Sequence, residues 1–275
     1  MILPRILTAI IGIPLVILSI KFGSIPYFVF ILAITCLALN EYFYLTKQAE
    51  YETYPVVGFI IGVLFVLSIY FNGPRITTLD MESQLTSIVL SFCIFLLLLI
   101  EIIRNAPYGS ISRLGITLFA LFIISWPFGH MLLIRDLRPN GEKFTYFLFF
   151  LIWLVDTGAY AAGSKWGKHK LADKISPKKS VEGVIGALVT SVISSIILWK
   201  VLGLTMFSLT EIVVVGLVLT GLCVISDLAE SLIKRDSNLK DSDSLLPGHG
   251  GILDRFDSFI FTAPLFYYYL VILHK

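Results

Sequence analysis

The longest polar interval of this 275-residue chain is SDLAESLIKRDSNLKDSDSLLPGHGGILDRFDS, residues 226–258. Its acidic residues are Asp227, Glu230, Asp236, Asp241, Asp243, Asp254 and Asp257, and they are interleaved with Lys234, Arg235, Lys240 and Arg255. Both ends of the interval run directly into long apolar segments, so it presents charge at the boundary of a membrane. This arrangement fits a site for metal ions and phosphates better than it fits a scaffold.

The composition around this interval sets the class of protein. Hydrophobic residues make up 57% of the chain and charged residues only 15%, whereas soluble domains carry about 25% charged residues. Repeated apolar runs of about 20 residues therefore predict an all-α, polytopic transmembrane protein. The net charge of +2 gives no reason to expect nucleic acid as a partner. The bilayer itself is the expected surrounding.

We expect nine spans, with the active site at the cytoplasmic membrane boundary. They are roughly Ile6–Ile20, Pro26–Leu45, Pro55–Phe71, Leu85–Ile103, Leu114–Ile134, Phe144–Gly163, Gly183–Leu202, Leu209–Leu228 and Phe259–Leu273. The first two spans could instead form a shallow hairpin. Residues 1–25 are expected to be a retained anchor, because no small-x-small cleavage site precedes Lys21. Residues 1–140 would supply packing and lipid-facing helices, and residues 141–275 the catalytic region.

The distribution of cations predicts the orientation. With nine spans, the N-terminus and the loops between spans 6 and 7 and between spans 8 and 9 share one side. About two thirds of the 21 lysines and arginines fall on that side. The positive-inside bias places it in the cytoplasm, with the C-terminus outside, in the cell (inner) membrane of a bacterial-type cell.

Small and sulfur-containing residues indicate packing. Gly58 and Gly62 are four residues apart, which favours close contact between helices. The alternative use of this pair, as the seam of a homodimer, stays open. Cys36, Cys93 and Cys223 lie in apolar runs without a CxxC pair, so they are expected to be packed thiols.

The first group of residues that could take part in binding or catalysis is LVDTGAYAAGSKWGKHKLADKISPKKSVEG, residues 154–183. Asp156 lies inside an apolar run, and an acid within a membrane span usually has a functional role. The alternative is a structural ion pair with a lysine from a neighbouring helix. Ala159, Gly163 and Gly167 are four residues apart, so they form a helix face without large side chains. Such a face suits close packing with another helix, or the wall of a cavity in which a ligand lies close to the backbone. Ser176-Pro177 predicts a turn, followed by Lys178 and Lys179 at a helix start that favours phosphate. The alternative is a basic loop that binds lipid headgroups.

The second group lies in the opening interval. Asp227 and Glu230 are three residues apart and share a helix face, and Lys234 continues that face. Asp254 and Asp257, again three apart, would begin the last span, where capping of the helix explains one acid but not the set. The glycines of Pro247-Gly248-His249-Gly250-Gly251 let the backbone approach a ligand closely. His249 would contact phosphate or metal, or else stabilise the turn.

Two blocks of this sequence resemble the phosphatidate cytidylyltransferases, the CDP-diacylglycerol synthases. One is S-x-I-K-R-x4-K-D followed by L-P-G-H-G-G-I-x-D-R-F-D, and the other is D-x-x-A-Y…G-K-H-K-L…I-S-P-K-K-S-x-E-G. Together they cover about residues 150–260. The resemblance implies transfer of CMP from CTP to phosphatidic acid, which gives CDP-diacylglycerol and pyrophosphate.

The resemblance also implies roles for individual residues. It implies Mg²⁺, together with a monovalent cation such as K⁺. Asp227 and Asp254 are the first choices as Mg²⁺ ligands, followed by Asp257 and Glu230. Phosphates would be held by Lys178, Lys179, Lys234, Arg235, Lys240 and Arg255, with hydrogen bonds from Ser176, Ser226 and Ser231. Asp156 and Tyr160 would line the cavity, and Gly250 and Gly251 would lie close to substrate. The expected catalytic set is Asp227, Asp254, Lys234, Arg235, Arg255 and His249.

Two other functions are weighed against this one. A CTP-dependent lipid or polyprenol kinase would transfer the γ-phosphate and release CDP without pyrophosphate. An ion-coupled transporter would use the intramembrane acids as ion sites without consuming CTP. It would leave the His-Gly-Gly block unexplained.

Overall fold

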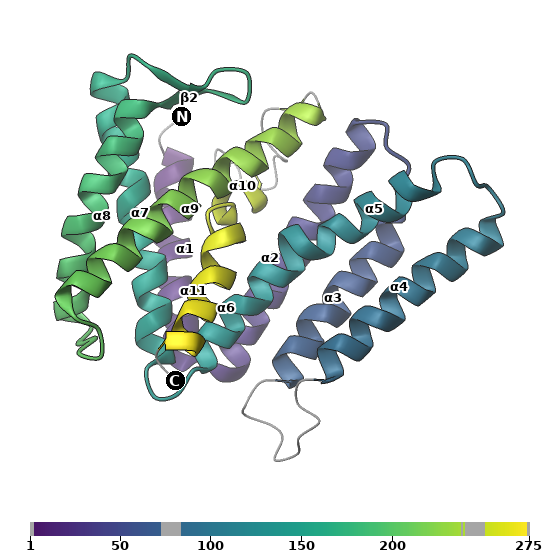
Figure 1. Cartoon of the computed structure of the whole chain (residues 1–275), viewed down its shortest axis with the longest axis horizontal. Coiled ribbons are helices and arrows are strands. Elements are labelled where there is room, and N and C mark those ends of the chain that lie inside the picture. Colours follow the sequence, from purple (N-terminus) through teal and green to yellow (C-terminus); the bar gives the residue numbers. More distant parts are fainter. Residues whose placement is uncertain (1–2, 73–83, 238, 240–250, 274–275) are drawn as a thin grey trace.

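The computed structural model of the chain describes residues 3–72, 84–237, 239 and 251–273 (Figure 1). Its elements in chain order are α1 (Leu3–Phe22), α2 (Ser24–Gln48), α3 (Pro55–Phe71), α4 (Gln84–Arg104), α5 (Ser110–Ala120), the π-helical turn η1 (Leu121–Ser125), α6 (Trp126–Asp136), α7 (Gly141–Trp166), β1 (Lys170–Ala172), β2 (Ser176–Ser180), α8 (Val181–Val201), α9 (Leu209–Asp236), α10 (Leu253–Phe256) and α11 (Phe259–Leu273).

The length and apolar character of these helices confirm the predicted class. Among the described residues, seven helices are long and apolar enough to cross a membrane. Two shorter apolar helices cover Ile10–Phe22 and Pro55–Phe71. The protein is therefore an all-α polytopic membrane protein. The number of nine spans and the orientation in the membrane stay predictions.

The segment before α8 differs from the prediction. The expected turn at Ser176-Pro177 is wrong, because these residues begin β2, which pairs antiparallel with β1, and the turn lies at residues 173–175. Both strands of a two-stranded hairpin are edges, and an edge strand tolerates a proline. Lys178 and Lys179 therefore lie on a strand that runs directly into α8, rather than on the first turn of a helix.

The helices form one bundle, in which α2 from the first half of the chain contacts α10 near its end. α8 packs on α7 and α9, and α11 packs on α6 and α9. Figure 1 shows α7 and α8 at one side of the molecule, α3 and α4 at the other, and α2, α6 and α11 between them. The hairpin and the C-terminal end of α9 lie at the same end of the bundle, whereas α11 ends at the opposite end (Figure 1).

A single large hydrophobic core runs through both predicted regions of the chain. It includes Ile31 and Phe128 from the first region, and Phe147 and Phe266 from the second. The rings of Phe147 and Phe266 lie 5.9 Å apart between centroids. Residues 1–140 and 141–275 thus share one core, and their division into packing and catalysis stays a prediction.

Glycines set the closest helix contacts. A Cβ on Gly58 would meet Phe43 and Thr117, and one on Gly62 would meet Leu39 and Ser125. This pair therefore packs within the chain, as the favoured interpretation predicted.

The α7–α8 contact is equally close. A Cβ on Gly158 would collide with Thr190, and Gly163 lies against Gly183 at the start of α8. Because α7 and α8 approach so closely, Asp156 on α7 is held near the hairpin and the start of α8.

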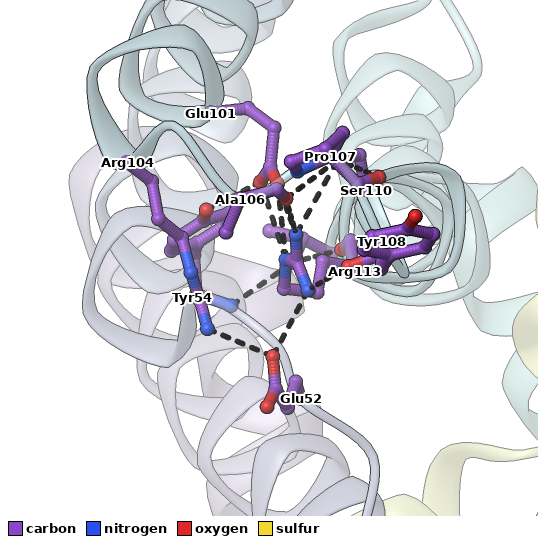
Figure 2. A network of polar contacts seen from close by, with 10 residues as sticks. Glu52, Tyr54, Glu101, Arg104, Ala106, Pro107, Tyr108, Ser110 and Arg113 are labelled. Carbon is purple, nitrogen blue, oxygen red and sulfur yellow. Dashed lines mark hydrogen bonds and ion pairs between the residues drawn. The ribbon is translucent and has the colours of Figure 1, made fainter.

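A buried polar network connects the helices at the α4 side of the bundle (Figure 2). The guanidinium of Arg113, only 4% exposed, forms an ion pair with Glu101 and a second one with Glu52 at 3.0 Å. The hydroxyl of Tyr54 donates to Glu101, and Arg104 pairs with Glu52 at 2.8 Å. This network joins α4, α5 and the segment before α3.

Candidate active site

Three carboxylates from two separate helical segments converge at the end of α9. Asp227 and Glu230 share a face of α9, because residues three apart are neighbours on a helix. Asp257 follows α10, and each of the three offers an oxygen within 4.8 Å of the others'. Glu230 is fully buried, and its carboxylate has the ammonium of Lys234 beside it. These three carboxylates could hold a divalent cation.

Two lysines form ion pairs with acids at this site. Lys234, one helical turn beyond Glu230, lies 2.7 Å from Glu230 Oε2 and 2.6 Å from Asp254 Oδ1. Lys179 reaches across from β2 and lies 2.5 Å from Asp227 Oδ2. The acids are thus paired with cations that could also bind phosphate.

A polar cavity of about 270 Å³ opens beside the carboxylates. It is lined by Asp156, Asp227, Lys234, Asp254, Arg255, Asp257 and Ser258. Four acids and two basic residues give this wall a formal charge of −2 when all of them are ionised. A divalent cation would balance that charge.

A larger cavity of about 550 Å³ adjoins the first between α7, α8, α9 and β2. The two cavities share Asp156, Asp227 and Lys234. The larger one has an apolar wall that includes Val155, Val184 and Ala187, and a polar rim that includes Ser176, Lys178, Lys179, Ser231 and Arg235. A molecule with an anionic head and an apolar body would match this lining.

The hairpin is held in place by contacts from α8 and α9. Glu182 accepts the backbone N–H groups of Lys168 and His169, and its Oε1 lies 2.6 Å from His169 Nδ1. The side chain of Ser180 accepts the N–H of Gly183 and so caps α8. Arg235 donates from Nε to the carbonyl of Ile175 at 3.0 Å. These contacts fix where Lys178 and Lys179 meet the cavity.

The structure brings together most of the residues predicted from the sequence. The cavity walls contain Asp156, Tyr160, Ser176, Lys178, Lys179, Asp227, Ser231, Lys234, Arg235, Asp254, Arg255 and Asp257. Lys240, His249 and Gly250 lie outside the described residues. Gly251 is buried, and its N–H donates to Asp254 Oδ2 at 3.0 Å.

Ser226 has a different place from the one expected. Its side chain is completely buried and accepts the N–H of Phe261 at 3.1 Å. This bond ties α9 to α11 and does not direct the hydroxyl at a cavity. We therefore assign Ser226 a structural role.

Two residues of the site were not selected from the sequence. Ser258 lines the smaller cavity, and the only signal for it was its place directly after Asp257. Cys223 was expected to be a packed thiol and is buried, but its Sγ also lies 3.6 Å from Asp156 Oδ1. Cys223 is one helical turn before Asp227, a spacing that could have indicated it.

Carboxylates and lysines that meet beside two adjoining cavities in a membrane bundle could bind a metal ion and phosphates. The chain belongs to the cytidylyltransferase family, whose sequence profile matches residues 3–273. It is similar to the phosphatidate cytidylyltransferase of Bacillus subtilis (strain 168), with 30% identity over 98% of this chain and 97% of that protein. The phosphatidate cytidylyltransferase of Haemophilus influenzae is 33% identical, over 98% of this chain and 99% of its own. The phosphatidate cytidylyltransferase of Staphylococcus saprophyticus is 31% identical, over 95% of this chain and 96% of that protein.

Proposed function

We propose that this chain transfers CMP from CTP to phosphatidic acid and forms CDP-diacylglycerol and pyrophosphate. The observation that carries the proposal is the polar cavity with Asp227 and Asp257 at its wall and Glu230 grouped with them, next to a partly apolar cavity edged by lysines. The membership of the cytidylyltransferase family and the similarity to phosphatidate cytidylyltransferases support it.

The carboxylates fit Mg²⁺ as the required ion. Their oxygens are hard ligands, which Mg²⁺ prefers, and this ion takes only one or two protein carboxylates alongside substrate phosphates and water. The single ammonium of Lys234 is shared by Glu230 and Asp254, so a divalent ion would supply positive charge that the three clustered carboxylates still lack. Two of Asp227, Glu230 and Asp257 would ligate the ion, and the third acid and Asp254 would lie next to it. Bound Mg²⁺ supplies positive charge that neutralises the phosphates and the leaving pyrophosphate.

The basic residues would position the two substrates. The attacking group is a phosphate oxygen of the lipid, which is already anionic near neutral pH, so the reaction needs no strong general base. The difficulty is repulsion between this group and the triphosphate. Lys234 lines both cavities, and Lys179 lines the larger one and contacts Asp227, which lines both. These two lysines would hold both anions in line, while Arg255 would stabilise the departing pyrophosphate.

The larger cavity would receive the lipid. Its wall of Val155, Val184 and Ala187 suits acyl chains, and Lys178 on its rim suits a phosphate. Tyr160 on the same wall is 78% exposed on the outside of the bundle. The lipid would therefore reach the site sideways from the bilayer, whereas CTP would arrive from the water at the end of the bundle.

By the positive-inside rule this end of the bundle would lie in the cytoplasm. The protein would lie in the cell (inner) membrane of a bacterial-type cell. A monovalent cation is proposed as a second ion on the basis of the resemblance alone. The possible homodimer stays a prediction.

Product analysis tests the proposal. Purified protein is incubated with α-³²P-labelled CTP, phosphatidic acid and Mg²⁺, and the lipid is then extracted. The label should appear in CDP-diacylglycerol with one pyrophosphate for each CTP, and EDTA should stop the reaction. Release of CDP with a phosphorylated lipid would establish the kinase instead, and intact CTP would refute both enzymes.

A further inference from the structure

Glu41 on α2 reaches the start of the helix that carries Asp254. It is fully buried. Its Oε1 accepts the N–H of Ile252 at 2.6 Å, and its Oε2 accepts the N–H of Leu253 at 2.8 Å. More than 200 residues separate the acceptor from the two donors along the chain.

These contacts satisfy backbone N–H groups at the start of α10. The first N–H groups of a helix have no partner within the helix, and leaving them buried and unsatisfied costs free energy. Here three consecutive amides donate to carboxylates, because Gly251 donates to Asp254 Oδ2 while Ile252 and Leu253 donate to Glu41. Hydrogen bonds to a carboxylate are about twice as strong as neutral ones, and a negative charge at a helix N-terminus is further favoured.

The segment held in this way carries the acids of the active site. Asp254 directly follows Leu253, and Asp257 comes one turn later. The ring of Phe256, between the two acids, packs against Phe30 of α2 and Phe128 of α6, with centroids 6.2 Å and 6.1 Å apart. The position of Asp257 relative to Asp227 and Glu230 is thus set by helices of the first 140 residues.

We infer that Glu41 is a positioning residue of the active site, because its carboxylate fixes the start of α10 and thereby the placement of Asp254 and Asp257. The inference rests on the proposed function of these acids as the Mg²⁺ site. Glu41 lies outside both cavities, so it acts only through the backbone amides that it binds. It gives the N-terminal helices a part in catalysis beyond packing.

The test is Glu41→Gln, with Glu101→Gln as its matched control. An amide keeps the size of the side chain, but its NH₂ would face one of the two N–H groups. Glu101 is also a buried carboxylate of the first 140 residues, but it binds Arg113 and Tyr54 in the network of Figure 2. Both variants lose a buried charged hydrogen bond, and only Glu41→Gln should disturb the acids.

Mg²⁺ binding is measured without substrate, as the rise in Tm of the purified proteins during titration with MgCl₂. For Glu41→Gln we expect the apparent Mg²⁺ affinity to fall about 10–100-fold, as when an outer partner of a metal ligand is removed. In turnover, the Mg²⁺ concentration for half-maximal rate should rise by the same factor. Glu101→Gln should lower Tm and leave both Mg²⁺ constants unchanged.

Equal Mg²⁺ constants in Glu41→Gln and wild type would overturn the inference, and so would an equal loss in Glu101→Gln. If Glu41→Gln does not fold in detergent, Glu41→Asp takes its place, since it keeps the charge and shortens the reach by one methylene. Its Mg²⁺ affinity should then fall several-fold. A wild type that binds Mg²⁺ but forms no CDP-diacylglycerol would refute the proposed function, whereas the Tm titration would still decide the role of Glu41.

Discussion

Substitution of Lys234 tests how the negative charge of the buried carboxylates is compensated. Its ammonium lies within 2.7 Å of Glu230 and 2.6 Å of Asp254, and the side chains of these acids are 1% and 12% exposed. Lys234→Met keeps the length of the side chain but leaves two nearly buried carboxylates without their cation. Removal of one partner from a buried ion pair costs about 3–5 kcal/mol. At about 2–4 °C for each kcal/mol in a chain of this size, Tm should fall by about 10 °C in EDTA.

Saturating Mg²⁺ should reduce that loss, because an ion at the carboxylates replaces the missing positive charge. Catalysis should not recover in the same way. A fixed cation that meets the charge developing in the transition state contributes about 10²–10³-fold to kcat. We therefore expect Lys234→Met in Mg²⁺ to be folded and at least 100-fold slower than wild type.

The measurement combines thermal unfolding in EDTA and in Mg²⁺ with the rate of CDP-diacylglycerol formation in mixed micelles. Lys200→Met is the control, since Lys200 is an exposed lysine in the last turn of α8, at the other end of that helix. Its Tm and kcat should match those of wild type. If Lys234→Met has the same Tm as wild type in EDTA and a kcat within about threefold, Lys234 is neither a structural counter-ion nor a phosphate ligand.

Three further outcomes follow from the same geometry. Asp227→Asn should lower kcat at least 100-fold, about 2.7 kcal/mol, and abolish the Mg²⁺-dependent rise in Tm, so a normal Mg²⁺ titration would exclude Asp227 as a ligand. Lys179→Met should raise KM for a phosphate-bearing substrate about 10-fold or more, since it removes a charged contact; unchanged KM for both CTP and lipid would contradict this. Gly158→Ala should lower stability by about 1–3 kcal/mol, because the new Cβ collides with Thr190. Gly115→Ala, where a Cβ meets nothing within 4 Å, should leave Tm unchanged or raise it.

The parts of this site that depend on helix periodicity could be predicted from the sequence. Asp227 and Glu230 are three residues apart, and the helix geometry alone places them on one face. Their nearness to Asp257 followed from the expectation that both polar ends lie at one membrane boundary. α9 and α11 pack on each other and bracket the polar interval, which brings these acids together. Their position at a membrane boundary stays a prediction.

The hairpin could not be predicted in the same way. Ser176–Ser180 has a proline and two lysines, which argue against a strand, and its pairing partner is only three residues long. What holds the hairpin is tertiary, since Glu182 accepts two of its N–H groups and Arg235 of α9 binds the carbonyl of Ile175. Local propensity contains no information on such contacts.

Glu41 escaped prediction for a related reason. It is an acid near the end of an apolar span, where it resembles a residue at the membrane boundary. Its partners are backbone N–H groups, which every residue except proline carries, so no side chain elsewhere in the sequence marks them. Only the packing of α2 against the start of α10 reveals the connection.

The lysine–carboxylate pairs explain how so many acids can share one end of a membrane bundle. Lys179 is paired with Asp227, and the ammonium of Lys234 is shared by Glu230 and Asp254. If Mg²⁺ and a triphosphate bind here, these carboxylates would ligate the metal and the lysines would bind phosphate, so the charges paired now would find new partners. Because a buried charge is costly only when it is unpaired, this exchange lets the site bind two anions with little net desolvation.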